Sequence, residues 1–127
     1  MKKILFVDDS KVQLMLARKY TNEIDPSLEV VTELSGPSSL EIFDQLKDDL
    51  LLAVLDFNME PIDGLELLKQ FANRFPVDRL VICSANAQQI LADKVEAYGA
   101  SFIQKPLTKE KLEQAINNAR VRIKATA

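Results

Sequence analysis

The sequence is poor in cysteine, and it has no long apolar run. Its one cysteine, Cys83, has no partner for an internal disulfide, and its place in the apolar run 80–83 predicts a buried thiol without a chemical role. The apolar run at 4–7 follows two lysines but is too short for a signal peptide, and no other stretch approaches the length of a membrane span. These absences lead us to expect a cytoplasmic protein that does not associate with membranes.

An excess of basic residues is missing as well. The formal net charge is -3 and the sequence pI is about 5.0, whereas a protein that binds nucleic acid directly needs a clustered basic face. The 127 residues, 47% of them hydrophobic, are enough for one domain with a substantial core and leave no room for a second. We therefore predict one domain over residues 1–127 that makes no direct contact with nucleic acid.

Apolar runs of strand length alternate with segments of helical period along the chain. The predicted strands lie at 4–7, 28–34, 51–55, 80–83 and 101–103. The first helical segment has Val12, Met15, Leu16 and Tyr20 on one face, and later segments show the same pattern. Five strands that alternate with five helices predict right-handed crossovers and a parallel sheet covered on both faces.

Local signals mark where several of these helices begin and end. The pairs with the spacing of a capping box are Ser10 with Gln13, Asp63 with Glu66, and Asn86 with Gln89. Pro37 suits the first turn of a helix, and Gly99 is typical of the residue that ends one. We expect helices to start and stop at these positions.

The predicted fold is a doubly wound (βα)5 sandwich of three layers, the flavodoxin-like α/β arrangement, with strand order 2-1-3-4-5. In such sheets the ligand crevice lies at the carboxyl ends of the strands, beside the switch point between strands 1 and 3. The residues that follow the predicted strand ends there are Asp8 and Asp9, Asp56, Ser84, and Lys105 with Pro106. We expect these side chains to meet at one edge of the sheet.

Three aspartates in one crevice repel each other, so they need raised pKa values or a bound cation. Mg²⁺ is the ion that fits best, because it is held by a few oxygen ligands and keeps water positions that phosphate oxygens can take. A carboxylate can act as the covalent acceptor of a phosphoryl group, and positive charge from the metal and Lys105 would surround the equatorial oxygens. Ser84 offers a hydroxyl donor to another of those oxygens. The pattern therefore predicts phosphoryl transfer.

The sequence resembles the CheY-like receiver domains of response regulators. The resemblance is carried by four motifs that occur in the same order, each at a strand end: Asp8-Asp9, Asp56, Ser84-Ala85 and Lys105-Pro106. The resemblance covers essentially the whole chain and includes Met59, Asp63 and Gly64.

The resemblance implies a role for each site residue. Asp56 is expected to be the phosphoacceptor, and Asp9, Asp56 and the backbone carbonyl of Asn58 are expected to bind Mg²⁺, for which Mn²⁺ can substitute, with Asp8 acting largely through water. Ser84, Ala85 and Lys105 would contact the phosphoryl group, and the Lys105-Pro106 bond is expected to be cis. Asn58 and Asn86 would modulate the attacking water and so set the phosphoryl lifetime.

The resemblance also implies how the protein signals. Ser84 and Phe102 would form a switch that biases the face of helix 4, strand 5 and helix 5, which an effector protein reads. A chain without histidine cannot be its own phosphohistidine donor, so a sensor histidine kinase or a histidine phosphotransfer protein is the expected partner. With no output domain, the protein would act as a monomer or a weak phosphorylation-dependent dimer.

One departure from the family is Glu60-Pro61. In the family, the proline usually follows directly after the methionine, which is Met59 in this sequence.

Other functions remain open at this stage. A phosphatase with an aspartyl-phosphate intermediate shares the acceptor chemistry, although Asn58 stands where haloacid dehalogenases have a second aspartate. A flavodoxin-like FMN binder fits poorly, because the chain has only three glycines and the crevice is filled with carboxylates. A degenerate receiver that signals by binding alone is the third alternative.

Overall fold

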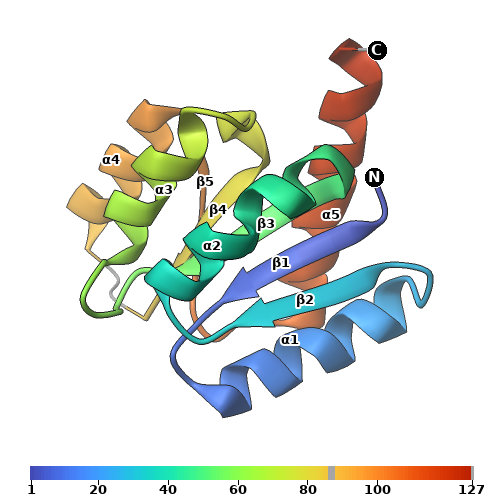
Figure 1. The fold of residues 1–127 in the computed structure, drawn as a ribbon, viewed down its shortest axis with the longest axis horizontal. Helices are drawn as coiled ribbons and strands as arrows, with labels where there is room; N and C mark the ends of the chain where they lie inside the picture. Colours follow the sequence, from blue (N-terminus) through green and yellow to red (C-terminus); the bar gives the residue numbers. More distant parts are fainter. Residues whose placement is uncertain (86–87, 127) are drawn as a thin grey trace.

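The structure, a computed structural model, describes residues 1–85 and 88–126. It contains a five-stranded parallel sheet with helices on both sides (Figure 1). In chain order the elements are β1 (Lys3–Val7), α1 (Lys11–Ile24), β2 (Glu29–Glu33), α2 (Gly36–Leu46), η1 (Lys47–Asp49), β3 (Leu50–Asp56), α3 (Gly64–Ala72), η2 (Val77–Arg79), β4 (Leu80–Ser84), α4 (Gln89–Tyr98), β5 (Ser101–Gln104) and α5 (Lys109–Thr126).

The strand order is β2-β1-β3-β4-β5, and all four neighbouring pairs are parallel. Both the fold class and the strand order predicted from the sequence are therefore confirmed. Because β1 and β3 are adjacent at the centre, the crossovers leave them in opposite directions, and a crevice opens at their carboxyl ends.

Two separate hydrophobic clusters lie on the two faces of the sheet. On one face, α2, α3 and α4 cover a cluster that includes the stacked rings of Phe43 and Phe71, whose centroids are 3.9 Å apart. On the other face, α1 and α5 cover a cluster built around fully buried Leu112, Ile116 and Ala119. β3 is buried along its whole length, since both clusters pack on it.

Most of the local signals act as predicted. Ser10 and Asp63 each cap a helix by accepting a hydrogen bond from the backbone N–H three residues later. Pro37 lies in the first turn of α2, and Gly99 ends α4 in the left-handed conformation at φ 103°. The predicted cap Asn86 lies outside the described residues, and α4 begins at Gln89, with Gln88 at the N-cap.

The predicted buried face of α1 is wrong in part. Its buried residues are Leu14, Ala17 and Thr21, whereas Val12 and Met15 are exposed by 63% and 70%. The helix carries apolar residues on two faces, and the cluster on this side of the sheet takes in Leu14 and Ala17, with Tyr20 of the predicted face packed against it. No helix among residues 1–85 and 88–126 has the length and apolar character needed to cross a membrane.

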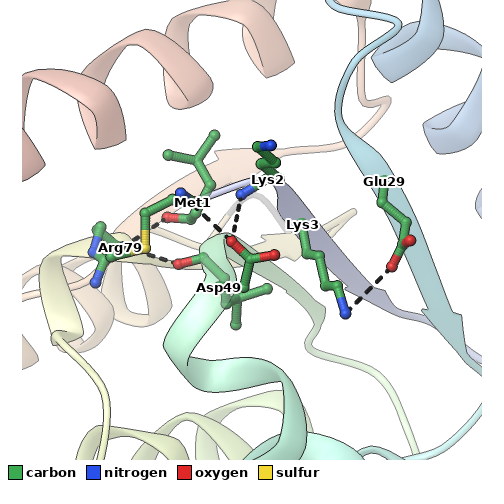
Figure 2. A network of polar contacts seen from close by, with 8 residues as sticks. Met1, Lys2, Lys3, Glu29, Asp49 and Arg79 are labelled. Carbon is green, nitrogen blue, oxygen red and sulfur yellow. Dashed lines mark hydrogen bonds and ion pairs between the residues drawn. The ribbon is translucent and has the colours of Figure 1, made fainter.

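The amino ends of the strands are joined by a polar network (Figure 2). Asp49 accepts hydrogen bonds from the backbone N–H of Lys2, and the Lys3 ammonium lies 3.5 Å from a Glu29 carboxylate oxygen. Buried Arg79 donates to the Leu50 carbonyl at 2.9 Å. These contacts lie at the end of the sheet opposite the crevice.

Candidate functional site

Four strands deliver the predicted site residues to one edge of the sheet. β1 ends just before Asp8, β3 ends at Asp56, β4 ends at Ser84, and β5 ends just before Lys105. The backbone fixes their relative positions, because Lys105 N–H donates to the Ser84 carbonyl at 2.8 Å and Phe57 N–H donates to the Cys83 carbonyl at 3.0 Å. Residues that are far apart in sequence therefore face one crevice.

The three aspartates form a compact group of oxygen donors. One carboxylate oxygen from each of Asp8, Asp9 and Asp56 lies within 4.8 Å of the other two. Asp8 and Asp56 are buried, with 8% and 5% exposure, whereas Asp9 is exposed. Such an arrangement suits a hard divalent cation that keeps part of its water shell. The buried carboxylates of Asp8 and Asp56 would bind it from within the crevice, and the carboxylate of Asp9 would bind it from the solvent side. The donor set therefore fits Mg²⁺.

Lys105 is placed between two of these carboxylates. Its Nζ lies 3.0 Å from Asp8 Oδ2 and 3.0 Å from Asp56 Oδ1. Burial acts to lower the pKa of Lys105, but its hydrogen bonds to Asp56 and Asp8 outweigh burial, so the pKa is raised. The ammonium therefore stays charged at neutral pH, directly beside the predicted acceptor oxygen. The Lys105-Pro106 peptide bond is cis, as is the Glu60-Pro61 bond.

Asp56 is the most strongly desolvated of the acids in this site. Burial raises its pKa, the hydrogen bond from Lys105 lowers it, and the charges of Asp8 and Asp9 raise it further, with a net upward shift. An ionised Asp56 therefore costs free energy in the folded protein even with the Lys105 ammonium beside it. A cation in the crevice would add positive charge to that of Lys105.

The start of α3 packs directly against the end of β3. A Cβ on Gly64 would lie 2.4 Å from the Asp56 carbonyl oxygen and 2.8 Å from the Phe57 Cα, so only glycine fits there. Gly64 N–H donates to the Phe57 carbonyl at 2.9 Å, which closes the loop between them. Gly64 therefore holds the loop that follows the acceptor.

The remaining predicted residues lie around the rim of the crevice. Asn58 and Glu60 are exposed and line one open depression together with Asp9, so the extra carboxylate of Glu60 faces the same solvent space as the acidic group. Ala85 is exposed at the end of β4. The predicted lifetime residue Asn86 lies outside the described residues.

Ser84 and Phe102 are neighbours across β4 and β5. Ser84 pairs with Gln104, two residues beyond Phe102, so both side chains project from the same face of the sheet. Ser84 is fully buried, and half-buried Phe102 packs against the cluster under α2, α3 and α4.

Cys83 lies directly beneath the site. It pairs with Asp56 across β3 and β4, and it is 4% exposed. Burial raises the pKa of its thiol to about 11. The prediction of a buried thiol is therefore confirmed.

One residue that contacts the site backbone was missed from the sequence. Lys111 donates from Nζ to the carbonyl oxygens of Gln104 and Pro106, at 2.8 and 3.2 Å. The sequence feature that could have indicated this contact is the position of Lys111 in the first turn of the last helix. A positive charge is unfavourable there and needs a local partner.

Comparisons with known proteins agree with this geometry. Residues 4–117 match the family model described as the response regulator receiver domain. The chain is 31% identical over 121 residues to the chemotaxis protein CheY of Listeria monocytogenes, with 94% of this chain and 98% of that protein covered. It is 30% identical to CheY of Bacillus subtilis, with 91% of this chain and 94% of that protein covered.

Solved structures give the same result. A receiver domain protein from Clostridium thermocellum has a TM-score of 0.91 at 26% identity, with 100% of both chains covered. The CheX-CheY-BeF3-Mg complex from Borrelia burgdorferi has a TM-score of 0.77 at 23% identity, with 90% of this chain and 85% of that chain covered. The fold and the match over most of the chain agree, and the chain belongs to the response regulator receiver domain family of two-component signalling.

Proposed function

We propose that this chain is a response regulator receiver that accepts a phosphoryl group on Asp56. The observation that carries the proposal is the 3.0 Å contact between Lys105 Nζ and Asp56 Oδ1, next to the acidic group of Asp8 and Asp9. The donor would be a sensor histidine kinase, a histidine phosphotransfer protein or a small phosphodonor. The protein is a phosphoacceptor rather than an enzyme that acts on other molecules.

In the proposed reaction, an Asp56 carboxylate oxygen forms a bond to phosphorus while the bond from phosphorus to the donor breaks. The electron pair of the broken bond leaves with the donor group. Mg²⁺ held by Asp8, Asp9, Asp56 and the Asn58 carbonyl would supply positive charge to the phosphoryl oxygens. Lys105 keeps its ammonium beside the acceptor, and the Ser84 hydroxyl and the end of β4 at Ala85 would bind another oxygen.

Signalling would follow from Ser84 and Phe102. When Ser84 bonds to the phosphoryl group, the end of β4 is drawn toward Asp56, and Phe102 packs behind it. A groove lined by Phe102, Ile103, Lys111 and Gln114 lies on the surface of β5 and α5, where such a change would be exposed to an effector protein. The neighbour from Borrelia burgdorferi was solved in a complex of CheY with CheX, BeF3 and Mg²⁺.

Incubation with acetyl phosphate and Mg²⁺, followed by intact-mass spectrometry, tests the acceptor. We expect one phosphoryl group on the wild type and none on Asp56→Asn. Asp48→Asn, which changes an exposed aspartate in η1 at the opposite end of the sheet, is the matched control and should be labelled like the wild type. Chelation of Mg²⁺ should abolish labelling. Equal labelling of Asp56→Asn and the wild type would refute the proposal.

A further inference from the structure

The connection between β5 and α5 is fastened by one side chain. Lys111 Nζ donates to the Gln104 carbonyl at 2.8 Å and to the Pro106 carbonyl at 3.2 Å. These two carbonyls belong to the residues on either side of Lys105. The backbone N–H of Lys111 also donates to Thr108 Oγ1 at 3.2 Å, so both ends of Lys111 hold this turn.

The position of Lys111 is unfavourable for the helix itself. Lys109 and Lys111 lie in the first turn of α5, where the helix dipole disfavours positive charge. The Lys111 side chain is exposed, so burial does not explain its conformation. Its ammonium instead turns back onto two carbonyl oxygens, whose partial negative charge offsets the dipole.

The contacts of Lys105 require that the turn between β5 and α5 hold its side chain in one direction. Its N–H is fixed by the Ser84 carbonyl at 2.8 Å, and its ammonium must reach Asp8 and Asp56 at 3.0 Å each. The backbone before and after Lys105 sets the direction of the side chain, and a shift of about 1 Å in a charged donor weakens its effect on a reacting group strongly.

We propose that Lys111 is a positioning residue for phosphoryl transfer. It clamps the carbonyls on both sides of Lys105 and so holds the Lys105 ammonium against the acceptor oxygen. This inference rests on the proposed function, because it assigns Lys111 a part in the same reaction.

The test compares the rates of phosphorylation by acetyl phosphate at saturating Mg²⁺. Lys111→Met keeps the length of the side chain but removes the ammonium, and we expect a rate about fivefold lower than wild type, which is the size of effect expected from the typical net contribution of one hydrogen bond. Lys111→Arg retains donors that can reach both carbonyls and should restore most of the rate. Lys109→Met removes the same charge from the same helical turn, and we expect it to react like the wild type.

A second background separates positioning from a general structural effect. In Lys105→Met the group that Lys111 positions is gone, so the further change Lys111→Met should leave the residual rate unchanged. Equal slowing by Lys111→Met in both backgrounds, or equal slowing by Lys109→Met, would overturn the positioning role. Lys111→Met reacting at the wild-type rate, with the wild type labelled on Asp56, would overturn this inference alone. An unlabelled wild type would instead refute the proposed function.

Discussion

Asp56 combines two properties that conflict at the level of one residue. Its carboxylate is 5% exposed and lies near two other carboxylates, so the charged form is costly, yet a nucleophile must be ionised. Lys105 offsets part of the cost, but the pKa of Asp56 is still raised, first by burial. The charged form of this proposed acceptor therefore lowers the stability of the fold.

The raised pKa predicts that Asp56→Asn is more stable than the wild type at pH 7. Because the pKa is higher in the folded state than in the unfolded state, ionisation of Asp56 destabilises the fold above the folded pKa, and the penalty disappears as the pH falls below the unfolded value of 3.8. Thermal unfolding without Mg²⁺ should show a higher Tm for the variant at pH 7 and a shrinking difference toward pH 4. Asp48→Asn should show no such trend, and a lower Tm for Asp56→Asn at pH 7 would contradict the assignment.

At the scale of the element, the contact between α3 and β3 constrains the site most tightly. The amino end of α3 reaches the backbone of the acceptor strand only because residue 64 has no side chain. The same helix is capped by Asp63, whose side chain accepts from Glu66 N–H at 2.9 Å. Capping and close approach together fix the loop between Asp56 and α3.

Gly64→Ala is expected to destabilise the protein by about 2 kcal/mol, because the added Cβ meets backbone atoms that cannot move aside without shifting β3. Urea unfolding measures the loss. Gly36→Ala is the matched control, since its Cβ would lie 3.2 Å from the Ile62 Cβ, a side-chain atom that can move. Equal stabilities of Gly64→Ala and the wild type would show that the contact is looser than described.

The elements also show how far the sequence allows prediction. Short-range signals such as the Ser10 and Asp63 caps depend on neighbours three residues away, and they were predicted correctly. The gathering of Asp8, Asp9, Asp56 and Lys105 followed from the rule that parallel strands end at one edge. The buried face of α1 was predicted wrongly because Val12 and Met15 have helical spacing too, and only tertiary packing selects Leu14 and Ala17.

Contacts between side chains and distant backbone were beyond prediction. The clamp of Lys111 on Gln104 and Pro106 depends on the direction of one flexible side chain. The proximity of Lys105 to Asp8 and Asp56 was expected, but its simultaneous 3.0 Å contacts with both carboxylates depend on the combined register of three strands. The spacing of residues in the sequence does not predict the direction of a side chain or the register of strands closely enough to identify such contacts.

At the scale of the whole molecule, two hydrophobic clusters share a single sheet. Both depend on β3, which is buried along its length and contributes residues to each cluster. Disruption on one face should therefore be transmitted to the other, and the domain should unfold as one cooperative unit.

Ile116→Ala tests this coupling from the face of α1 and α5. Ile116 is fully buried, so we expect a loss of about 2–5 kcal/mol in the free energy of unfolding. The two tyrosines report on opposite faces, with Tyr20 on α1 and Tyr98 on α4. Tyr98→Phe and Tyr20→Phe backgrounds each leave one fluorescent probe, and both should give the same midpoint for Ile116→Ala. Separated midpoints would mean that the two faces unfold independently.

The position of Cys83 gives this molecule an internal reporter. Its thiol lies opposite the acceptor across the central strands, out of contact with solvent and with a pKa of about 11. A thiol reagent can reach it only when the packing around it opens, and the reaction then labels a single site. The rate of modification would measure how often the structure opens around Cys83, next to the proposed acceptor. A comparison of this rate with and without a phosphodonor would show whether phosphorylation makes such openings rarer.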